Sequence, residues 1–191
     1  ADGTPIVRVT PTYDQVGNVS SVEDALGNTT TYTYDELYRR TRVEDALGKE
    51  TVMTYDEEGN LLTLTDASGN VTSHTYDPLN RLDTETITVD GAQLTRSYTY
   101  DAASNLIEQT DRNGRVQAFT YDKLNRQVQE QWLDGNGADV HTIDYSYDAA
   151  SQIKRVSDAV SSYAYTYDAA GRLTSTDNAG TAGTPDVLLN Y

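Results

Sequence analysis

The stretch Tyr167-Asp-Ala-Ala-Gly-Arg-Leu-Thr-Ser-Thr-Asp177 is one copy of a motif that recurs along the whole chain. The Tyr-Asp dipeptide at its start is found at residues 13, 34, 55, 76, 100, 121, 147 and 167, most often 21 residues apart. Self-similarity at such a period indicates a repeat protein, in which each repeat is one small supersecondary unit. We therefore expect residues 1–191 to form a single array of about eight repeats.

The residues before each Tyr-Asp alternate in character. Thr, or Ser at position 146, stands directly before the Tyr, and in most repeats a bulky residue stands two places before it, as in Tyr32-Thr33-Tyr34. Alternation with a period of two is typical of a β-strand whose two faces differ. Each Tyr-Asp therefore marks the end of a strand with bulky side chains on one face and hydroxyl side chains on the other.

The Asp of each dipeptide opens a tight turn. Its fourth position is Gly in three repeats, as in Asp56-Glu-Glu-Gly59, and in the others it is Asn80, Asn125, Ser104, Ser151 or Tyr38. Asp accepts hydrogen bonds from nearby backbone N–H groups, and Gly or Asn readily adopts a positive φ. The pattern predicts a three-residue hairpin loop that is built on a type I turn and ends in a left-handed residue. Tyr38 occupies this last position in one repeat, so we expect that turn to differ or to be strained.

A second turn of the same kind follows about ten residues later in most repeats, so each repeat has two strands and two tight turns. Hairpins joined by short turns form an antiparallel meander. The expected fold class is all-β, a tandem antiparallel β-hairpin repeat array with a twisted and curved sheet. The second turns begin at Asp24, Asp45, Asp66, Asp111, Asp134 and Asp177, with degenerate versions at Asp90 and Asp158.

The composition narrows the possible functions. The chain has no Cys, which excludes disulfides, thiolate metal ligands and cysteine nucleophiles. The net charge is −16, yet 16 of the 30 acidic residues are Asp residues that open turns, which leaves 14 against 14 Lys and Arg. A negative chain is a poor partner for nucleic acid, and no apolar run approaches the ~20 residues that span a bilayer. We expect no nucleic acid binding and no membrane insertion, and residues 1–10 lack the apolar segment of a signal peptide.

The two histidines, His74 and His141, have no spaced nucleophile or metal ligand beside them. His74 stands where other repeats have Tyr, Met or Phe, which favours a packing role. The rows of Asp match neither the EF-hand loop nor the glycine-rich calcium repeat, and turn formation accounts for them. The sequence therefore predicts no enzyme activity, no catalytic residue, no metal and no cofactor.

Two insertions interrupt the period, one around Asp90-Gly91 and one from Trp132 to His141. Insertions in repeat proteins usually form loops on a rim, where partners bind. Trp132, the only Trp, and His141 are therefore the candidate partner contacts. The alternative is a slightly longer hairpin with Trp132 packed on its own sheet. The paired Tyr residues also have two interpretations, namely stacking against sugar rings and packing of the sheet face.

The motif around Tyr167, followed by Gly180, resembles the RHS or YD repeat almost letter for letter. The segments Tyr55–Leu61 and Tyr121–Arg126 are close versions. Family members include bacterial polymorphic toxins, the shell subunits of Tc toxins, wall-associated proteins and teneurins. The resemblance implies a long β-sheet that spirals into a hollow shell or solenoid, which in the toxins encloses a polypeptide.

The chain also differs from the toxin members of that family. It has no counterpart of the segment that plugs the shell and cleaves off the toxin with aspartates, so no Asp of the repeats is assigned that role. Tyr191 matches the first Tyr of Tyr-x-Tyr-Asp, so the array stops within a repeat. We expect the chain to be a fragment of a longer polypeptide.

The leading functional hypothesis is a structural segment of a β-sheet shell that encapsulates a polypeptide cargo, a toxin above all. The alternative is an extracellular self-assembling filament or adhesive surface protein, with carbohydrate binding by the Tyr face as a further hypothesis. The expected partners are a polypeptide cargo or further repeats of the same or a longer chain, with head-to-tail self-assembly in the alternative. The resemblance implies a secreted or cell-surface location.

Overall fold

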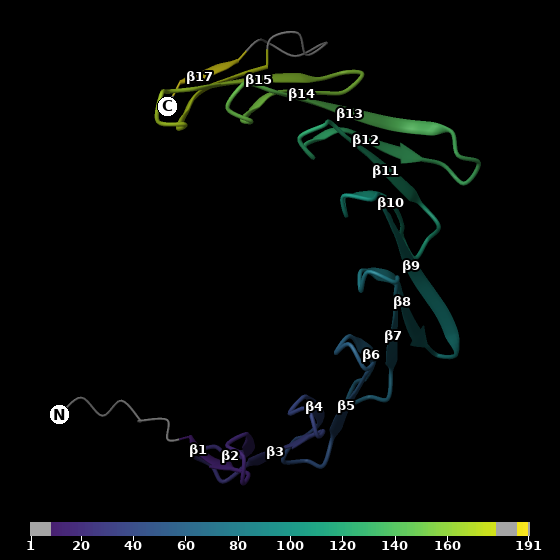
Figure 1. Cartoon of the computed structure of the whole chain (residues 1–191), viewed down its shortest axis with the longest axis vertical. Helices are drawn as coiled ribbons and strands as arrows, with labels where there is room; N and C mark the ends of the chain where they lie inside the picture. The colour runs from purple at the N-terminus through teal and green to yellow at the C-terminus, as the bar shows by residue number, and fades with distance from the viewer. Residues whose placement is uncertain (1–8, 179–186, 191) are drawn as a thin grey trace, which may run out of the picture. The chain divides into compact units, whose positions relative to one another are not determined.

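The computed structural model describes residues 9–178 and 187–190, and within them the protein consists of strands and turns (Figure 1). Seventeen strands belong to one sheet, so the predicted all-β antiparallel fold class is confirmed. The described part contains no helix that is long and apolar enough to cross a bilayer. Two compact units divide the chain, residues 1–95 and residues 96–191, and their boundary lies within β9 (Ala92–Tyr100).

In the first unit each strand from β1 to β8 pairs antiparallel with the next strand along the chain. In this unit β1, β3, β5 and β7 each end on the Tyr of a Tyr-Asp dipeptide, as the sequence predicts. The strands are β1 (Thr10–Tyr13), β2 (Val19–Glu23), β3 (Thr29–Tyr34), β4 (Arg40–Glu44), β5 (Glu50–Tyr55), β6 (Leu61–Thr65), β7 (Val71–Tyr76) and β8 (Leu82–Val89).

The second unit repeats this arrangement, with antiparallel pairing of consecutive strands from β9 to β17. Its strands after β9 are β10 (Leu106–Thr110), β11 (Val116–Tyr121), β12 (Gln127–Leu133), β13 (Asp139–Tyr147), β14 (Ile153–Ser157), β15 (Ser162–Tyr167), β16 (Leu173–Asp177) and β17 (Leu188–Asn190).

The two faces of the sheet differ as the period-two pattern predicts. In β5, Met53 and Tyr55 are half-buried, whereas Thr54 between them is exposed. Thr54 faces Thr63 of β6 in the register, and their hydroxyl oxygens lie 2.6 Å apart. Cross-strand hydroxyl pairs of this kind stabilise one face, while the Tyr, Met and Leu side chains pack on the other.

The turn after each Tyr-Asp has the predicted geometry. In the first repeat the Asp14 N–H donates to the Asn18 carbonyl at 2.8 Å, and the Gly17 N–H donates back to the Asp14 carbonyl at 3.2 Å. Gly17 has a φ of 97°, the left-handed conformation expected at the end of the loop. The same positive φ is found at Tyr38, Gly59, Asn80, Ser104, Asn125, Ser151 and Gly171.

Tyr38 adopts the same turn as the other repeats, so of the two expectations for this turn, a different geometry or strain, the structure agrees with strain. Its N–H donates to the Asp35 carbonyl at 3.0 Å, and its φ is 61°. A residue with a Cβ is strained in this region because the Cβ approaches the neighbouring carbonyl oxygen. The turn hydrogen bonds and the flanking strand pairing together impose this strain.

The second turns are more varied. Asp90 and Gly91 form a two-residue hairpin loop with φ values of 52° and 79°, the type I′ conformation. The turn at Asp158 is one residue shorter than the others and is closed by a 2.9 Å bond from the Asp158 N–H to the Ser161 carbonyl. Asp177 ends β16 and pairs with Leu188, while Gly180 of the turn expected there, and Tyr191, lie outside the described residues.

The two insertions lengthen strands, so the expectation that they form rim loops is wrong. β12 has 7 residues and β13 has 9, and the connection between them is the usual turn from Asp134 to Ala138. Trp132 lies inside β12. Additional cross-strand hydrogen bonds explain why the extra residues extend the hairpin.

Packing against a second layer contributes little to this fold. No hydrophobic residue of the described part is buried, and Ser162 is its only buried residue. Both faces of the sheet therefore remain open, and backbone pairing together with contacts between neighbouring strands must stabilise the repeats.

Candidate functional site

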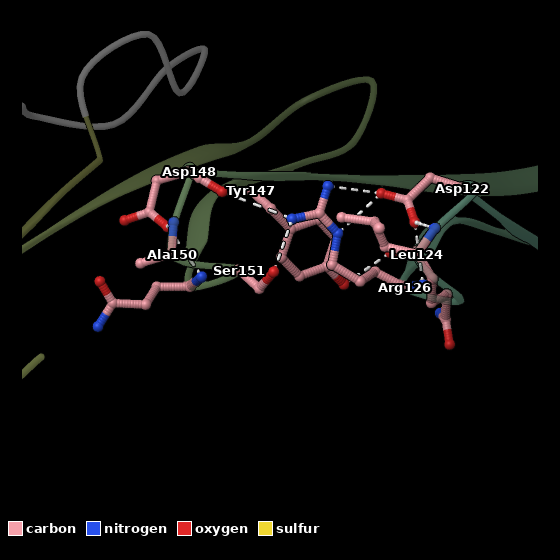
Figure 2. A network of polar contacts seen from close by, with 9 residues as sticks. Asp122, Leu124, Arg126, Tyr147, Asp148, Ala150 and Ser151 are labelled. Atoms are coloured by element: carbon pink, nitrogen blue, oxygen red, sulfur yellow. Dashed lines mark hydrogen bonds and ion pairs between the residues drawn. The ribbon is translucent and has the colours of Figure 1, made fainter.

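The carboxylate of each turn Asp organises its own turn. In the turn of Figure 2, Asp122 Oδ1 accepts the backbone N–H groups of Leu124 at 2.8 Å and Arg126 at 3.1 Å. Asp122 Oδ2 accepts from Arg126 Nε at 2.8 Å and lies 2.6 Å from a terminal guanidinium nitrogen. The same two backbone bonds to Oδ1 recur in both turn series, as at Asp14, Asp24, Asp35, Asp45, Asp66, Asp77, Asp101, Asp111, Asp134, Asp148 and Asp168.

These hydrogen bonds favour the ionised form of the turn carboxylates. The side-chain hydrogen bond from Arg115, and then its backbone N–H, lower the pKa of Asp111 below the ordinary 3.8. At Asp168 the backbone N–H of Arg172 is the larger cause of the lowered pKa, and its guanidinium is the second. Hydrogen bonds to a carboxylate stabilise its charge, so the turn contacts favour the ionised forms of Asp111 and Asp168.

In six repeats the hydroxyl of the Tyr in Tyr-Asp bonds to the strand before its own. The Tyr121 hydroxyl donates to the carbonyl of Leu106 at 2.9 Å, and Leu106 begins the neighbouring strand β10. The same donation runs from Tyr34 to Val19, Tyr55 to Arg40, Tyr76 to Leu61, Tyr147 to Gln127 and Tyr167 to Ile153. This bond explains why the motif has Tyr, with its hydroxyl, at the end of the strand.

In five repeats the residue directly after the left-handed turn position contacts the next repeat. Figure 2 shows the Arg126 guanidinium between its own turn and the turn that begins at Asp148. It donates to the Ser151 hydroxyl at 3.1 Å and to the Asp148 carbonyl at 3.5 Å. Its central carbon also lies 4.6 Å from the centre of the Tyr147 ring, a cation–π distance. Arg126 thus joins two successive repeats.

We call these contacts from one Tyr-Asp turn to the next the inter-repeat clamps. Arg39 forms one by donating to the Asp56 carbonyl at 2.6 Å while stacking 4.8 Å from the centre of the Tyr55 ring. An amide replaces the guanidinium in other repeats, where Nδ2 or Nε2 donates across to the next turn. These are Asn60 to Asn80 at 3.1 Å, Asn105 to Asn125 at 3.1 Å, and Gln152 to the Gly171 carbonyl at 3.1 Å.

Sequence reasoning missed the clamps, although a signal was present. The fifth residue after each Tyr of Tyr-Asp is a long or amide side chain with N–H donors: Asn18, Arg39, Asn60, Arg81, Asn105, Arg126, Gln152 and Arg172. A donor at a fixed position of every repeat indicates a repeated acceptor. Only the register between repeats shows that this acceptor belongs to the following turn.

The structure brings together the two residues that the sequence singled out. Trp132 of β12 and His141 of β13 are direct register partners, and their rings meet edge to face with centroids 6.1 Å apart. Trp132 Nε1 donates to Glu130 Oε1 at 2.6 Å, and His141 Nε2 lies 3.7 Å from Asp158 Oδ2. Trp132 is still 46% exposed, so much of the indole surface remains available for contact.

A concave surface lies beside this pair. It has a volume of about 460 Å³ and is lined by Asp111, Arg115, Val116, Gln117, Trp132, Leu133, Asp134, Gly135 and Val140. The hollow is formed by β11, β12, β13 and the turns at Asp111 and Asp134. Trp132 lines it and His141 does not.

His74 occupies a half-buried strand position, as Met53 does one repeat earlier. Its register partner is Glu85, and its Nδ1 is buried with no hydrogen-bond partner in the described structure. Throughout residues 9–178 and 187–190, no group of three or more His, Asp and Glu side chains is placed to hold a metal ion.

A family model described as RHS repeat matches residues 13–52, 55–93, 100–131 and 147–182, which is more than half of the chain. These matched segments begin at or next to Tyr-Asp positions, and they contain the turns, the hydroxyl bonds and the clamps described above. A comparison with curated protein sequences gives no match.

Solved structures with the same fold come from Tc toxins. The Photorhabdus luminescens Tc holotoxin pore with a mutated TccC3 gives a TM-score of 0.62 at 16% identity, covering 90% of this chain and 13% of that one. The TcdB2–TccC3–Cdc42 crystal structure gives 0.63 at 20% identity, covering 87% and 9%. TcdB2–TccC3 without the hypervariable C-terminal region gives 0.62 at 16% identity, covering 90% and 13%. This chain therefore spans about a tenth of the length of the chains it resembles.

Proposed function

Because the chain belongs to the RHS repeat family, we propose that it is a segment of a β-sheet shell that encloses a polypeptide cargo, and that this cargo is a toxin. The proposed role is structural and involves no catalysis by this chain. The neighbouring Tc structures, which contain TcdB2 together with TccC3, support this assignment by their fold. As a component of such an assembly, the protein would act outside the cell or at its surface.

The single observation behind this proposal is the combination of an open single-layer sheet with repeated clamps between turns. No described hydrophobic residue is buried, so the sheet does not close over a core of its own. The clamps at Arg39, Asn60, Asn105, Arg126 and Gln152 each connect one Tyr-Asp turn to the turn that follows it. A sheet whose successive repeats are joined by side-chain contacts, and whose two faces are both open, is suited to form part of a shell.

The width of the sheet, measured across its strands, agrees with a role as one segment of a larger shell. Seventeen strands at a spacing of ~4.8 Å provide about 80 Å of sheet measured across the strands. A ring of that perimeter is only ~25 Å across, which side chains would nearly fill. We therefore propose that the single array of about eight repeats is completed by further repeats of a longer polypeptide.

Electron microscopy of the native polypeptide that contains this chain tests the proposal. Closed hollow particles with internal density are expected. Protease treatment of the same particles should spare the enclosed polypeptide until urea opens the wall. Open fibres with an axial repeat and no protected polypeptide would instead support the alternative of a self-assembling surface filament.

A further inference from the structure

A polar hollow lies in the first unit, between the second turns of two successive repeats, residues 24–28 and 45–49. It has a volume of about 390 Å³, and its polar lining residues are Asn28, Thr29, Thr31, Glu44 and Asp45. Thr31 of β3 and Glu44 of β4 are register partners, and Thr29 lies two residues before Thr31. These three side chains therefore share one face of the sheet. We call this site the rim hollow.

Asp45 differs from most turn Asp residues in the contacts of its carboxylate. In most turns the side chain four residues later donates to the second carboxylate oxygen, as Asn70 Nδ2 does to Asp66 Oδ2 at 2.8 Å. Lys49 stands at that position after Asp45. Asp45 Oδ1 accepts the backbone N–H groups of Leu47 at 2.8 Å and Lys49 at 2.9 Å. Among the described residues no group donates to Asp45 Oδ2, so this oxygen remains for a ligand.

The rim hollow offers further acceptor atoms. Glu44 Oε2 accepts from Arg42 at 2.9 Å, which leaves Oε1 for another donor. Asn28 Nδ2 donates to the Asp of its own turn at 2.8 Å, which leaves the side-chain carbonyl oxygen. Within residues 9–178 and 187–190, the hydroxyl groups of Thr29 and Thr31 make no hydrogen bond. A complementary ligand must therefore supply several N–H donors close together.

The charges around the rim hollow favour a cation. Arg42 bonds to both Glu44 and its register partner Glu50, so one guanidinium serves two carboxylates. Asp45 adds a third carboxylate, and Lys49 forms no ion pair in the described part of the chain. A guanidinium suits this site, because its five N–H groups form a planar fork that matches a carboxylate with two parallel bonds. An ammonium has only three donors and no such fork.

Two exposed leucines flank the rim hollow. Leu26 and Leu47 are each the third residue of their turns, within the same sequence Asp-Ala-Leu-Gly. They are 87% and 85% exposed, the highest values among the large hydrophobic side chains of the described residues. The two turns are two strands apart, ~10 Å. Apolar surface on both sides of a polar hollow favours an arginine within a polypeptide, whose neighbouring residues can cover the leucines.

We propose that the rim hollow binds an arginine side chain of a partner polypeptide, with apolar residues of the partner packed against Leu26 and Leu47. The guanidinium donates to Asp45 Oδ2 and Glu44 Oε1, and its other N–H groups face the oxygens of the threonines and Asn28. This docking site is independent of the proposed shell, because a partner can bind at these turns whether or not the sheet encloses a cargo.

Nuclear magnetic resonance of the full 191-residue chain tests the proposal. The probe is the peptide Gly-Leu-Arg-Leu-Gly, compared with the same peptide containing lysine or the neutral isostere citrulline in place of arginine. The arginine peptide should shift the backbone amide signals of Gly27, Ala46 and Gly48 saturably, the lysine peptide should bind more weakly, and the citrulline peptide should not saturate. Asp45→Asn should weaken binding of the arginine peptide on the order of tenfold, equivalent to ~1.4 kcal/mol. This change removes the charge but keeps an oxygen for the turn N–H groups.

Asp66→Asn is the matched control, because Asp66 begins the second turn of the next repeat, its Oδ2 already accepts from Asn70, and it does not line the rim hollow. It should leave the affinity unchanged. Agmatine, a free alkylguanidinium, should bind more weakly than the peptide. Replacement of both Leu26 and Leu47 by Ser should weaken the peptide and leave agmatine unaffected. Circular dichroism checks that each variant keeps the fold.

The proposal is overturned if the arginine peptide does not saturate the shifts up to about 10 mM, where even a site with a Kd of ~1 mM is mostly filled. Equal affinity for the citrulline peptide, or equal weakening by Asp45→Asn and Asp66→Asn, also overturns it. Equal affinity for agmatine and the peptide contradicts the assignment to a polypeptide and identifies a small guanidine ligand instead.

Discussion

Replacement of Arg126 by alanine measures what an inter-repeat clamp contributes to the stability of the sheet. Arg126 contacts two successive repeats, and its side chain is only 24% exposed. It bonds to its own turn through Asp122 and to the next repeat through Ser151, the Asp148 carbonyl and the Tyr147 ring.

The expected loss can be estimated from those contacts to the next repeat. The cation–π contact contributes about 0.5–1 kcal/mol, and hydrogen bonds from a charged donor at a half-buried site contribute about 1–2 kcal/mol. We therefore expect Arg126→Ala to lower the free energy of unfolding by about 2 kcal/mol. For a unit of this size the midpoint temperature should fall on the order of 10 °C.

Arg172→Ala is the matched control. Arg172 also pairs with the Asp of its own turn, with Nε 2.7 Å from Asp168 Oδ2, but its side chain is 81% exposed. An exposed arginine of this kind contributes about 0.5 kcal/mol. Thermal and urea unfolding, followed by far-ultraviolet circular dichroism and by Trp132 fluorescence, compare the two variants. If both variants unfold at the same midpoint, the contacts between repeats add nothing and the clamp argument is refuted.

Three further predictions concern other parts of the chain. Tyr38→Gly should raise the free energy of unfolding by about 0.5–1 kcal/mol, because Gly is not strained at the left-handed φ of 61°. Gly59→Ala should lower the free energy of unfolding for the same reason. The urea midpoints of both variants check these changes. The Arg81 side chain lowers the pKa of Asp77 below 3.8, so the ionised carboxylate stabilises the fold above that pH and the stabilisation is lost as the pH falls through the lowered pKa. Urea midpoints from about pH 6 to about pH 2 should therefore fall less steeply for Asp77→Asn than for the wild type, and equal slopes would contradict the assignment. Thr54→Pro should destabilise the first unit more than deletion of one whole 21-residue repeat does. Pro interrupts the pairing of an interior strand, whereas a deletion removes one unit from an array whose stability is additive. If both changes cause the same loss of circular dichroism signal, the stability of the array is not additive.

The local geometry of this fold was predictable because single residues determine it. Asp at the start of the turns, with Gly or Asn at the end of most of them, fixes the loop, and the alternation before Tyr-Asp fixes the strand faces. Tyr38 shows the limit of that reasoning, since its side chain disfavours the left-handed conformation that it nevertheless adopts. Two strands already paired in register leave the turn no other geometry, so tertiary context overrides the preference of one residue.

Contacts between repeats were less predictable because they depend on register. The clamp from Arg126 to Ser151 joins residues 25 positions apart, and only the strand pairing places them together. The insertion around Trp132 was expected to form a loop, but its residues continue the pairing of β12 with β13. Even so, the sequence singled out Trp132 and His141, and the structure places their rings in contact.

The open faces of this sheet have a thermodynamic consequence. The heat capacity change of unfolding arises mainly from apolar surface that becomes hydrated, and compact domains show about 12–15 cal/mol/K per residue. Since no described hydrophobic side chain is buried here, the value per residue should be smaller. A smaller heat capacity change flattens the dependence of stability on temperature. The repeats should therefore lose little stability on cooling, where proteins that depend on a buried core become weaker.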